Sequence, residues 1–147
     1  MAEVAGVPGR PSRRRTRRLA LEILYQADVT GAAPSDVLSE RELAGHAVPR
    51  FAREVVLGVE EHRAGLDRLI AEHVHGWTLE RMAVVDRNIL RVACFELLHR
   101  PDVPPAVAIS EAVEAAKELS TEESGSFVNG ILGGIAREVA ARTAGPA

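Results

Sequence analysis

The sequence predicts an all-α protein that folds as a compact bundle of six to seven helices. Apolar residues recur at spacings of three and four along most of the chain, which is typical of amphipathic helices. No window shows the sustained period-two alternation, rich in β-branched residues, that indicates strands. The segments between the periodic stretches are short, which favours a bundle over an extended solenoid. With 147 residues, 46% of them hydrophobic, the chain can form one domain around a core.

Two helices are predicted before Pro49. Ser12 can cap a first helix that extends to about Val29. The segment "TGAAPSD" interrupts the pattern, and Ser35 or Asp36 can cap a short second helix. On the first helix, four apolar residues form the stripe expected to face the core: Ala20, Ile23, Leu24 and Ala27.

The longest predicted helix covers residues 50–74. Its apolar positions, and His62 with them, fall on one face at helical spacing. Gly58 and Gly65 are seven positions apart and therefore lie on nearly the same side of this helix. Because a glycine in a helix interior costs about 1 kcal/mol relative to alanine, we expect a neighbouring helix to approach closely at both positions.

Three further helices are predicted in the second half. An apolar pattern covers residues 85–98, and the segment "HRPDVPP" must then be a connection, because its prolines cannot continue a helix. Pro104 or Pro105 suits the first turn of the next helix. The pattern "STEE" matches a capping box of Ser120 and Glu123, which predicts the start of the last helix.

We expect a single helical domain over residues 12–141, with a flexible N-terminal tail at 1–11 and a C-terminal tail at 142–147. No apolar run approaches the roughly 18 residues of a membrane helix, and the N-terminus lacks the regions of a secretory signal. The single cysteine, Cys94, excludes an internal disulfide framework. These features predict a cytoplasmic protein.

The sequence contains no pattern typical of a catalytic, metal or cofactor site. The histidines form no H-E-x-x-H motif, and His73 and His75 are two positions apart, so they project from different faces of a helix. The stretch "GILGGI" is rich in glycine, but no predicted strand precedes it as in a nucleotide-binding loop. We therefore expect no enzymatic activity, no metal and no cofactor.

Positive charge is concentrated at the start of the first helix. Residues 1–18 carry six arginines against Glu3, a formal charge of +5 in a chain whose net charge is −3. A basic segment on an acidic body indicates two surfaces with different partners. The stretch "SRRRTRR" contributes five of these arginines, which we call the arginine arm: Arg13, Arg14, Arg15, Arg17 and Arg18.

The position of the arm is unfavourable for the helix itself. The positive end of the helix dipole repels cations, and Arg13 with Arg17, like Arg14 with Arg18, forms a like-charge pair with no acid expected to relieve it. Bound phosphates would reverse this cost. Tyr25 lies on the same helical stripe as Arg14 and Arg18, and arginines leading to an aromatic ring suit single-stranded nucleic acid. A solvated charge run and a nuclear localisation signal remain alternatives from these residues alone.

Three longer motifs resemble the NusB family of bacterial transcription antitermination factors. They are "RRRTRRLALEILYQAD", "FAREVVLGV" and "VDRNILRVACFELLHRPDVPPAVAISEAVEAAKELSTEESGSFVNGIL", which cover most of residues 13–135. The resemblance implies two three-helix bundles packed roughly perpendicular, no enzymatic activity, and a role in transcription of ribosomal RNA. It also implies three partners: single-stranded boxA RNA, the small-subunit ribosomal protein NusE, and the transcription elongation complex.

The resemblance also implies site residues. For RNA binding these are the arginine arm, Tyr25, Glu123 and Phe127; for partner binding they are Glu80 and Asp86. Each residue of the second half has a local alternative. Glu123 can close its capping box, Asp86 can favour a helix N-terminus, and Phe127 can fill the core.

Two alternative functions follow from the same residues. One is a helical bundle that binds only proteins, with the arm as a solvated tail. The other is an accessory domain, because a similar helical module precedes an RNA methyltransferase domain in some longer proteins. Since the chain ends at Ala147 without a cofactor-binding domain, we expect a stand-alone factor. Some family members form homodimers, and the sequence leaves this state open.

Overall fold

The computed structural model describes residues 12–144, and all regular structure within them is helical, as predicted. The predicted tail at 1–11 lies outside the described residues, and the last helix extends past the domain end predicted at residue 141. No helix of the described range is long and apolar enough to cross a membrane. In chain order the elements are α1 (Arg13–Thr30), α2 (Pro34–Leu43), α3 (Arg50–Glu72), the 3₁₀ turn η1 (Leu79–Arg81), α4 (Val84–His99), α5 (Pro105–Leu119) and α6 (Glu122–Ala144).

A side-chain cap fixes the start of α1 but not that of α2. Ser12 caps α1 as predicted, since its Oγ accepts a hydrogen bond from the Arg15 amide at 3.2 Å. The predicted caps of α2 are wrong, because α2 begins at Pro34, a residue suited to the first helical position. The Ser35 amide in its first turn donates instead to Glu60 of α3, at 2.8 Å.

The predicted capping box at the start of α6 is also wrong. The Ser124 amide donates to Thr121 Oγ1 at 2.9 Å, so the cap is Thr121, one position after Ser120. Glu123 is exposed in the first turn of α6, where a carboxylate still favours the helix dipole.

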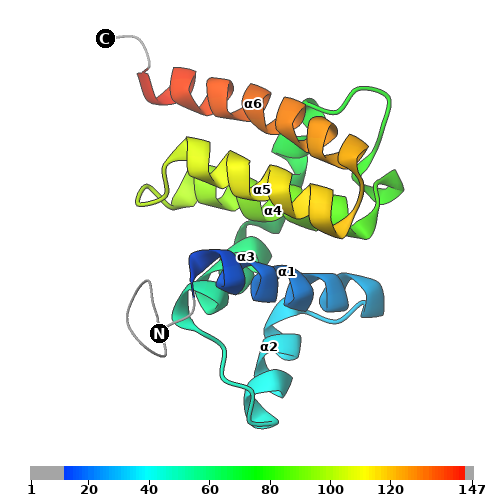
Figure 1. Ribbon diagram of the computed structural model, residues 1–147, viewed down its shortest axis with the longest axis vertical. Helices are drawn as coiled ribbons and strands as arrows, with labels where there is room; N and C mark the ends of the chain where they lie inside the picture. The colour runs from blue at the N-terminus through cyan, green and yellow to red at the C-terminus, as the bar shows by residue number, and fades with distance from the viewer. Residues whose placement is uncertain (1–11, 145–147) are drawn as a thin grey trace.

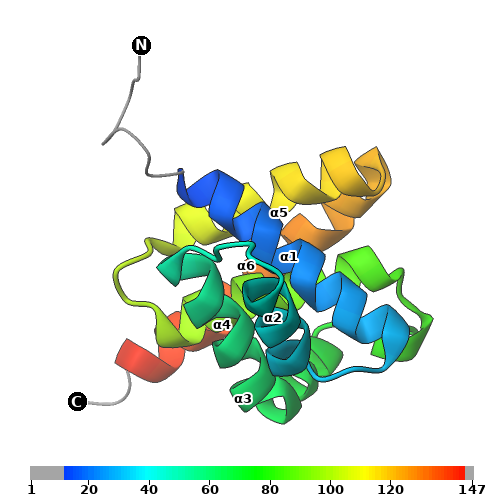
Figure 2. The ribbon, with the colours of Figure 1, turned by 90° about the horizontal axis from the view of Figure 1, so that it is seen from below.

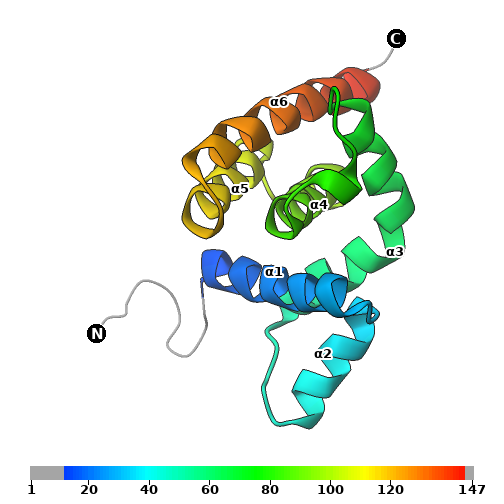
Figure 3. The same ribbon diagram turned by 90° about the vertical axis from the view of Figure 1, so that its right-hand side faces the viewer.

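The helices form two packed groups. Helices α1, α2 and α3 pack against one another, as do α4, α5 and α6. Along the long axis of the molecule, α6 lies at one end, followed by α4 and α5, then α1, with α2 at the other end (Figure 1). Helix α3 extends from the layer of α1 and α2 towards α6 and packs on all three of them and on α4 (Figure 3). Helices α3 and α4 therefore connect the two groups.

The core is built mainly from aliphatic side chains and is continuous across both groups. The stripe predicted on α1 is confirmed, since Ala20, Ile23, Leu24 and Ala27 are all at most 3% exposed. His62, predicted on the core face of α3, is only half-buried. Its ring stacks on that of His99 from α4, with 3.8 Å between the ring centroids.

Only one of the two glycines of α3 marks a close approach. A Cβ atom added at Gly58 would lie 2.2 Å from Cε1 of Phe95 on α4, so the ring occupies the space that a side chain would need. The same prediction for Gly65 is wrong, because nothing lies within 4 Å of its Cβ position and the residue is exposed. Gly58 therefore sets the distance between α3 and α4.

Alanine substitutions at the two glycines should have opposite effects. Gly58→Ala should destabilise the fold by about 1–3 kcal/mol through overpacking against Phe95. Gly65→Ala, the matched control, should stabilise it by up to about 1 kcal/mol through helix propensity alone. Urea denaturation followed by circular dichroism measures both free energies of unfolding. Equal effects of the two substitutions would contradict this account of the α3–α4 contact.

Candidate nucleic-acid interface

Three arginines of the arm are exposed at the start of α1. Arg13 Nη1 donates to Asp102 in the α4–α5 loop at 3.2 Å, and Arg14 donates through Nε and Nη2 to Glu111 of α5, both at 3.0 Å. Within residues 12–144, the Arg15 side chain has no hydrogen-bond or ion-pair partner. The start of α1 thus presents a row of guanidinium groups to solvent.

Acidic residues of another helix relieve the repulsion within the arm. Helix α5 lies beside the first turns of α1 (Figure 2), and its Glu111 and Glu118 pair with Arg14 and Arg18. Arg14 holds the pKa of Glu111 below its usual range, and Arg18 does the same for Glu118. The expectation that no acid relieves the like-charge pairs is therefore wrong. These acids are distant from the arm in sequence. The excess of acidic residues in 101–125 was the one sequence feature that could have indicated them.

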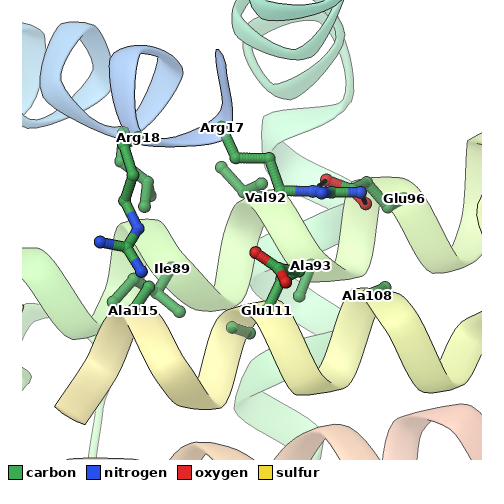
Figure 4. Close-up of a pocket in the computed structure, with 11 residues that line it drawn as sticks. Arg17, Arg18, Ile89, Val92, Ala93, Glu96, Ala108, Glu111 and Ala115 are labelled. Carbon is green, nitrogen blue, oxygen red and sulfur yellow. Dashed lines mark hydrogen bonds and ion pairs between the residues drawn. The ribbon is translucent and has the colours of Figure 1, made fainter. Parts of the chain in front are cut away.

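Arg17 differs from the other arginines because it is buried. Its Nε and Nη2 donate to the two carboxylate oxygens of Glu96 at 2.8 and 2.9 Å, and both residues are under 9% exposed. Figure 4 shows Arg17 reaching along α4 to Glu96, while Arg18 and Glu111 border the same small cavity between α1, α4 and α5. In the structure this side chain joins α1 to α4, and an RNA contact of Arg17 stays a prediction.

The ring of Phe51 supports three guanidinium groups. Arg13 lies 4.3 Å, Arg100 5.1 Å and Arg17 5.2 Å from the ring centroid, distances typical of cation–π contacts. Arg100 also pairs with Asp102, which is the partner of Arg13. Both residues follow the C-terminal end of α4. No local pattern in the sequence marks Phe51 or Arg100 as support for the arm.

Tyr25 lies in a groove on the arm's side of α1. The residue is 44% exposed and lines this groove together with Arg18, as their shared helical stripe predicts; Leu21 lines it as well. Val85 and Ile89 of α4 form the opposite wall. An exposed aromatic ring next to cationic side chains has the surface chemistry that single-stranded nucleic acid requires.

Other predicted site residues meet in a second groove, at the start of α4 and α6. Asp86, Glu123 and Phe127 line it, so the structure places two residues predicted to border RNA beside one predicted to bind the partner. Phe127 is half-buried and packs on the core, whereas Glu123 is exposed. Glu80 is exposed on η1 and does not line this groove.

A buried ion network that no local sequence pattern indicates joins three helices. Arg91 of α4 is 3% exposed and donates to Asp67 of α3 at 2.7 Å and to Asp28 of α1 at 3.1 Å. Asp28 also accepts from Arg87 at 2.7 Å and from Asn88 at 3.0 Å. These donors lower the pKa of Asp28 to about 2, with the Arg87 hydrogen bond as the largest cause. Within residues 12–144, no group of three or more His, Cys, Asp or Glu is arranged to hold a metal ion.

Residues 14–137 match the sequence profile of the NusB family. The chain belongs to this family. The transcription antitermination protein NusB of Acidothermus cellulolyticus is 46% identical over 137 residues, which cover 92% of this chain and 94% of that protein. The prediction of a non-enzymatic protein agrees with membership of the NusB family.

Solved structures of the NusB family share the fold. NusB of T. maritima superposes with a TM-score of 0.82 at 38% identity, over 91% of this chain and 96% of that chain. A crystal structure of the antitermination factors NusB and NusE in complex with dsRNA superposes with a TM-score of 0.76 at 26% identity, over 86% of this chain and 96% of the matched chain.

Replacing Arg17 should test its structural role in this NusB-family chain. Arg17→Ala leaves the buried carboxylate of Glu96 without its partner, which should cost about 3–5 kcal/mol of stability. Arg15→Ala, at an exposed position of the same turn, should change stability by less than about 0.5 kcal/mol. Urea denaturation gives both values. If Arg17→Ala weakened RNA binding without loss of stability, Arg17 would belong to the surface after all.

The Asp28 network predicts a pH dependence of stability. The pKa of Asp28 lies at about 2 in the folded chain and at 3.8 in the unfolded chain. Its contribution to the free energy of unfolding is therefore complete above about pH 4 and is lost as the pH falls towards 2. The contribution at neutral pH is on the order of 2 kcal/mol. The difference in unfolding free energy between the native chain and Asp28→Asn should therefore shrink on acidification from about pH 6 to pH 3. A constant difference would contradict the assignment.

Proposed function

We propose that this chain is a transcription antitermination factor that binds single-stranded, boxA-type RNA together with NusE and supports transcription of ribosomal RNA. The observation that carries the proposal is the row of exposed guanidinium groups at the start of α1, beside Tyr25, in a chain of the NusB family. A related NusB has been solved with NusE and dsRNA, which supports NusE and RNA as partners. A factor that acts with the elongation complex on nascent RNA works in the cytoplasm.

The intramolecular ion pairs of the arm are compatible with phosphate binding. A guanidinium group has five N–H donors, of which Arg14 uses two for Glu111 and Arg13 uses one for Asp102. Ion pairs between exposed side chains contribute only about 0–1 kcal/mol. A phosphate group can therefore bind the remaining donors or displace the carboxylate, and Arg15 is open to it without competition from the described residues.

Tyr25 gives the interface a preference for unpaired bases. Its exposed ring follows the arm on one face of α1, so a strand whose phosphates contact Arg14 and Arg18 continues towards Tyr25. Stacking of a base on an aromatic ring contributes about 1–3 kcal/mol and requires a base that is free of its duplex.

NusE docks, in this proposal, on the acidic surface around η1 and the start of α4. Glu80 is exposed there, and Asp86 lies in the adjoining groove. Outside residues 1–18 the chain carries an excess of acidic side chains, which complements a basic ribosomal protein.

Salt dependence of RNA binding tests the arm. We expect fluorescence anisotropy to show a preference for boxA RNA over scrambled RNA, strengthened by NusE. For single strands the slope of log affinity against log salt is about 0.7 per neutralised phosphate. The triple variant Arg13→Ala, Arg14→Ala, Arg15→Ala should lower this slope by up to about 2.

Arg68→Ala, an exposed arginine on α3, is the matched control and should leave the slope unchanged. An unchanged slope in the triple variant would remove the arm from the interface. Normal NusE binding with no RNA affinity under any condition would leave a bundle that binds only proteins.

A further inference from the structure

We propose that the bound RNA continues past the arm into a cleft at the start of α3, where Arg50 and Arg100 hold further phosphates of the strand. The cleft lies between the first turns of α1 and α3 and the C-terminal end of α4. Its charged and aromatic lining residues are Arg13, Arg50, Phe51, Glu54 and Arg100. The proposal rests on the proposed function, because it extends the path of the strand to residues outside the arm.

The position of the cleft makes it a continuation of the interface. Arg13 belongs to the arm and also lines the cleft. Neighbouring residues of a helix point about 100° apart, so Arg14 shares the side of α1 that carries Tyr25, whereas Arg13 points towards α3. Tyr25 and Arg13 are twelve positions apart, which is about 18 Å along the helix axis. A strand that follows Arg18 and Arg14 away from Tyr25 therefore reaches the cleft at the first turn of α1.

Two of the three guanidinium groups in the cleft have N–H donors to offer. Within residues 12–144, Arg13 donates only to Asp102 and Arg50 only to Glu54, and each uses one of its five donors. Arg100 uses three donors, two for Asp102 and one for Glu54. The cleft thus combines one firmly anchored cation with two cations that can still bind phosphate oxygens.

Phe51 fixes two of these cations before any ligand binds. Arg13 and Arg100 lie over its ring, at 4.3 and 5.1 Å from the centroid, and Phe51 itself is only 9% exposed. An arginine over an aromatic face still presents N–H donors at the edge of its planar group. Since the two side chains are already held in place, they lose little conformational freedom when a phosphate binds.

Positive charge exceeds negative charge in the cleft. Three guanidinium groups line it with one carboxylate, that of Glu54, and Asp102 is the one further acid paired with them in the described part of the chain. This excess attracts a phosphate. The cleft encloses about 470 Å³, so a phosphate fits together with its ribose. A strand already held by the arm brings its next phosphates to the cleft at high effective concentration, an advantage over free anions in the competition with Glu54.

The length of the RNA tests the cleft. We would trim boxA RNA to the shortest form that the full-length protein binds together with NusE, and then extend it by about four nucleotides at its 5′ or 3′ end. Fluorescence anisotropy should show binding that is tighter by about three- to fivefold for one of the two extensions. The salt slope should steepen by about 0.7 for each added phosphate contact. The same extension with uncharged methylphosphonate linkages should give no gain.

Variants connect the gain to the cleft. Arg50→Ala should abolish the gain and leave the affinity for the trimmed RNA unchanged, because Arg50 is 90% exposed and lies outside the arm. Glu54→Gln removes the competing carboxylate and should enlarge the gain, an effect that a merely structural role of Glu54 would not produce. Arg68→Ala, at another exposed arginine of α3, is the matched control and should leave the gain intact.

A tethered probe locates the extension without relying on affinity. The only cysteine of the chain, Cys94, is buried, so Arg50→Cys supplies a single exposed thiol for a hydroxyl-radical cleavage reagent. We expect this probe to cut the RNA within the extension. The same reagent on Arg68→Cys is the control and should not cut it.

Three results would overturn the proposal: no gain from either extension, a gain that persists in Arg50→Ala or with methylphosphonate linkages, or equal cleavage from positions 50 and 68. If the trimmed RNA binds normally and any of these results is obtained, only the cleft is rejected. If no RNA binds in the presence of NusE, the proposed function is rejected together with the cleft.

Discussion

Arg91 is the side chain on which the relative position of the two helical groups depends. It is buried on α4 and bonds to Asp67 of α3 and to Asp28 of α1. A buried charge is tolerated only when it is paired and hydrogen-bonded, so the three helices must meet where both carboxylates reach one guanidinium group. Aliphatic cores accept alternative packings at small cost, whereas this network is satisfied in one arrangement.

Buried ion pairs also set the orientation of the basic surface on α1. Asp28, near the C-terminal end of α1, and Arg17, near its N-terminal end, both bond to residues of α4. These two attachments fix the rotation of α1 about its axis. With the buried side of the helix determined, Arg14 and Tyr25 must face outward, towards α5 and solvent. The orientation of the basic surface thus follows from buried ion pairs rather than from the exposed arginines themselves.

Local patterns in the sequence predicted those features that depend only on neighbouring residues. The bounds of α1, the apolar stripe of Ala20, Ile23, Leu24 and Ala27, and the close approach at Gly58 all follow from helical periodicity and the steric demands of one residue. The errors arose where a distant segment supplies the partner. Glu60 replaces a serine cap on α2, and α5 supplies acids for the arm. Arg17 appeared identical to its neighbours in sequence, and only the position of Glu96 distinguishes it.

The carboxylates of α5 have a consequence for selectivity. Glu111 and Glu118 are resident competitors for the guanidinium groups that an anion would bind. At Arg14 and Arg18, an isolated phosphate or a free nucleotide competes with a tethered carboxylate, whose effective local concentration is high. A strand that presents several phosphates in a row makes the exchange at all arginines with one loss of translational freedom. The ion pairs with α5 therefore favour a polymer of phosphates over a single small anion at Arg14 and Arg18.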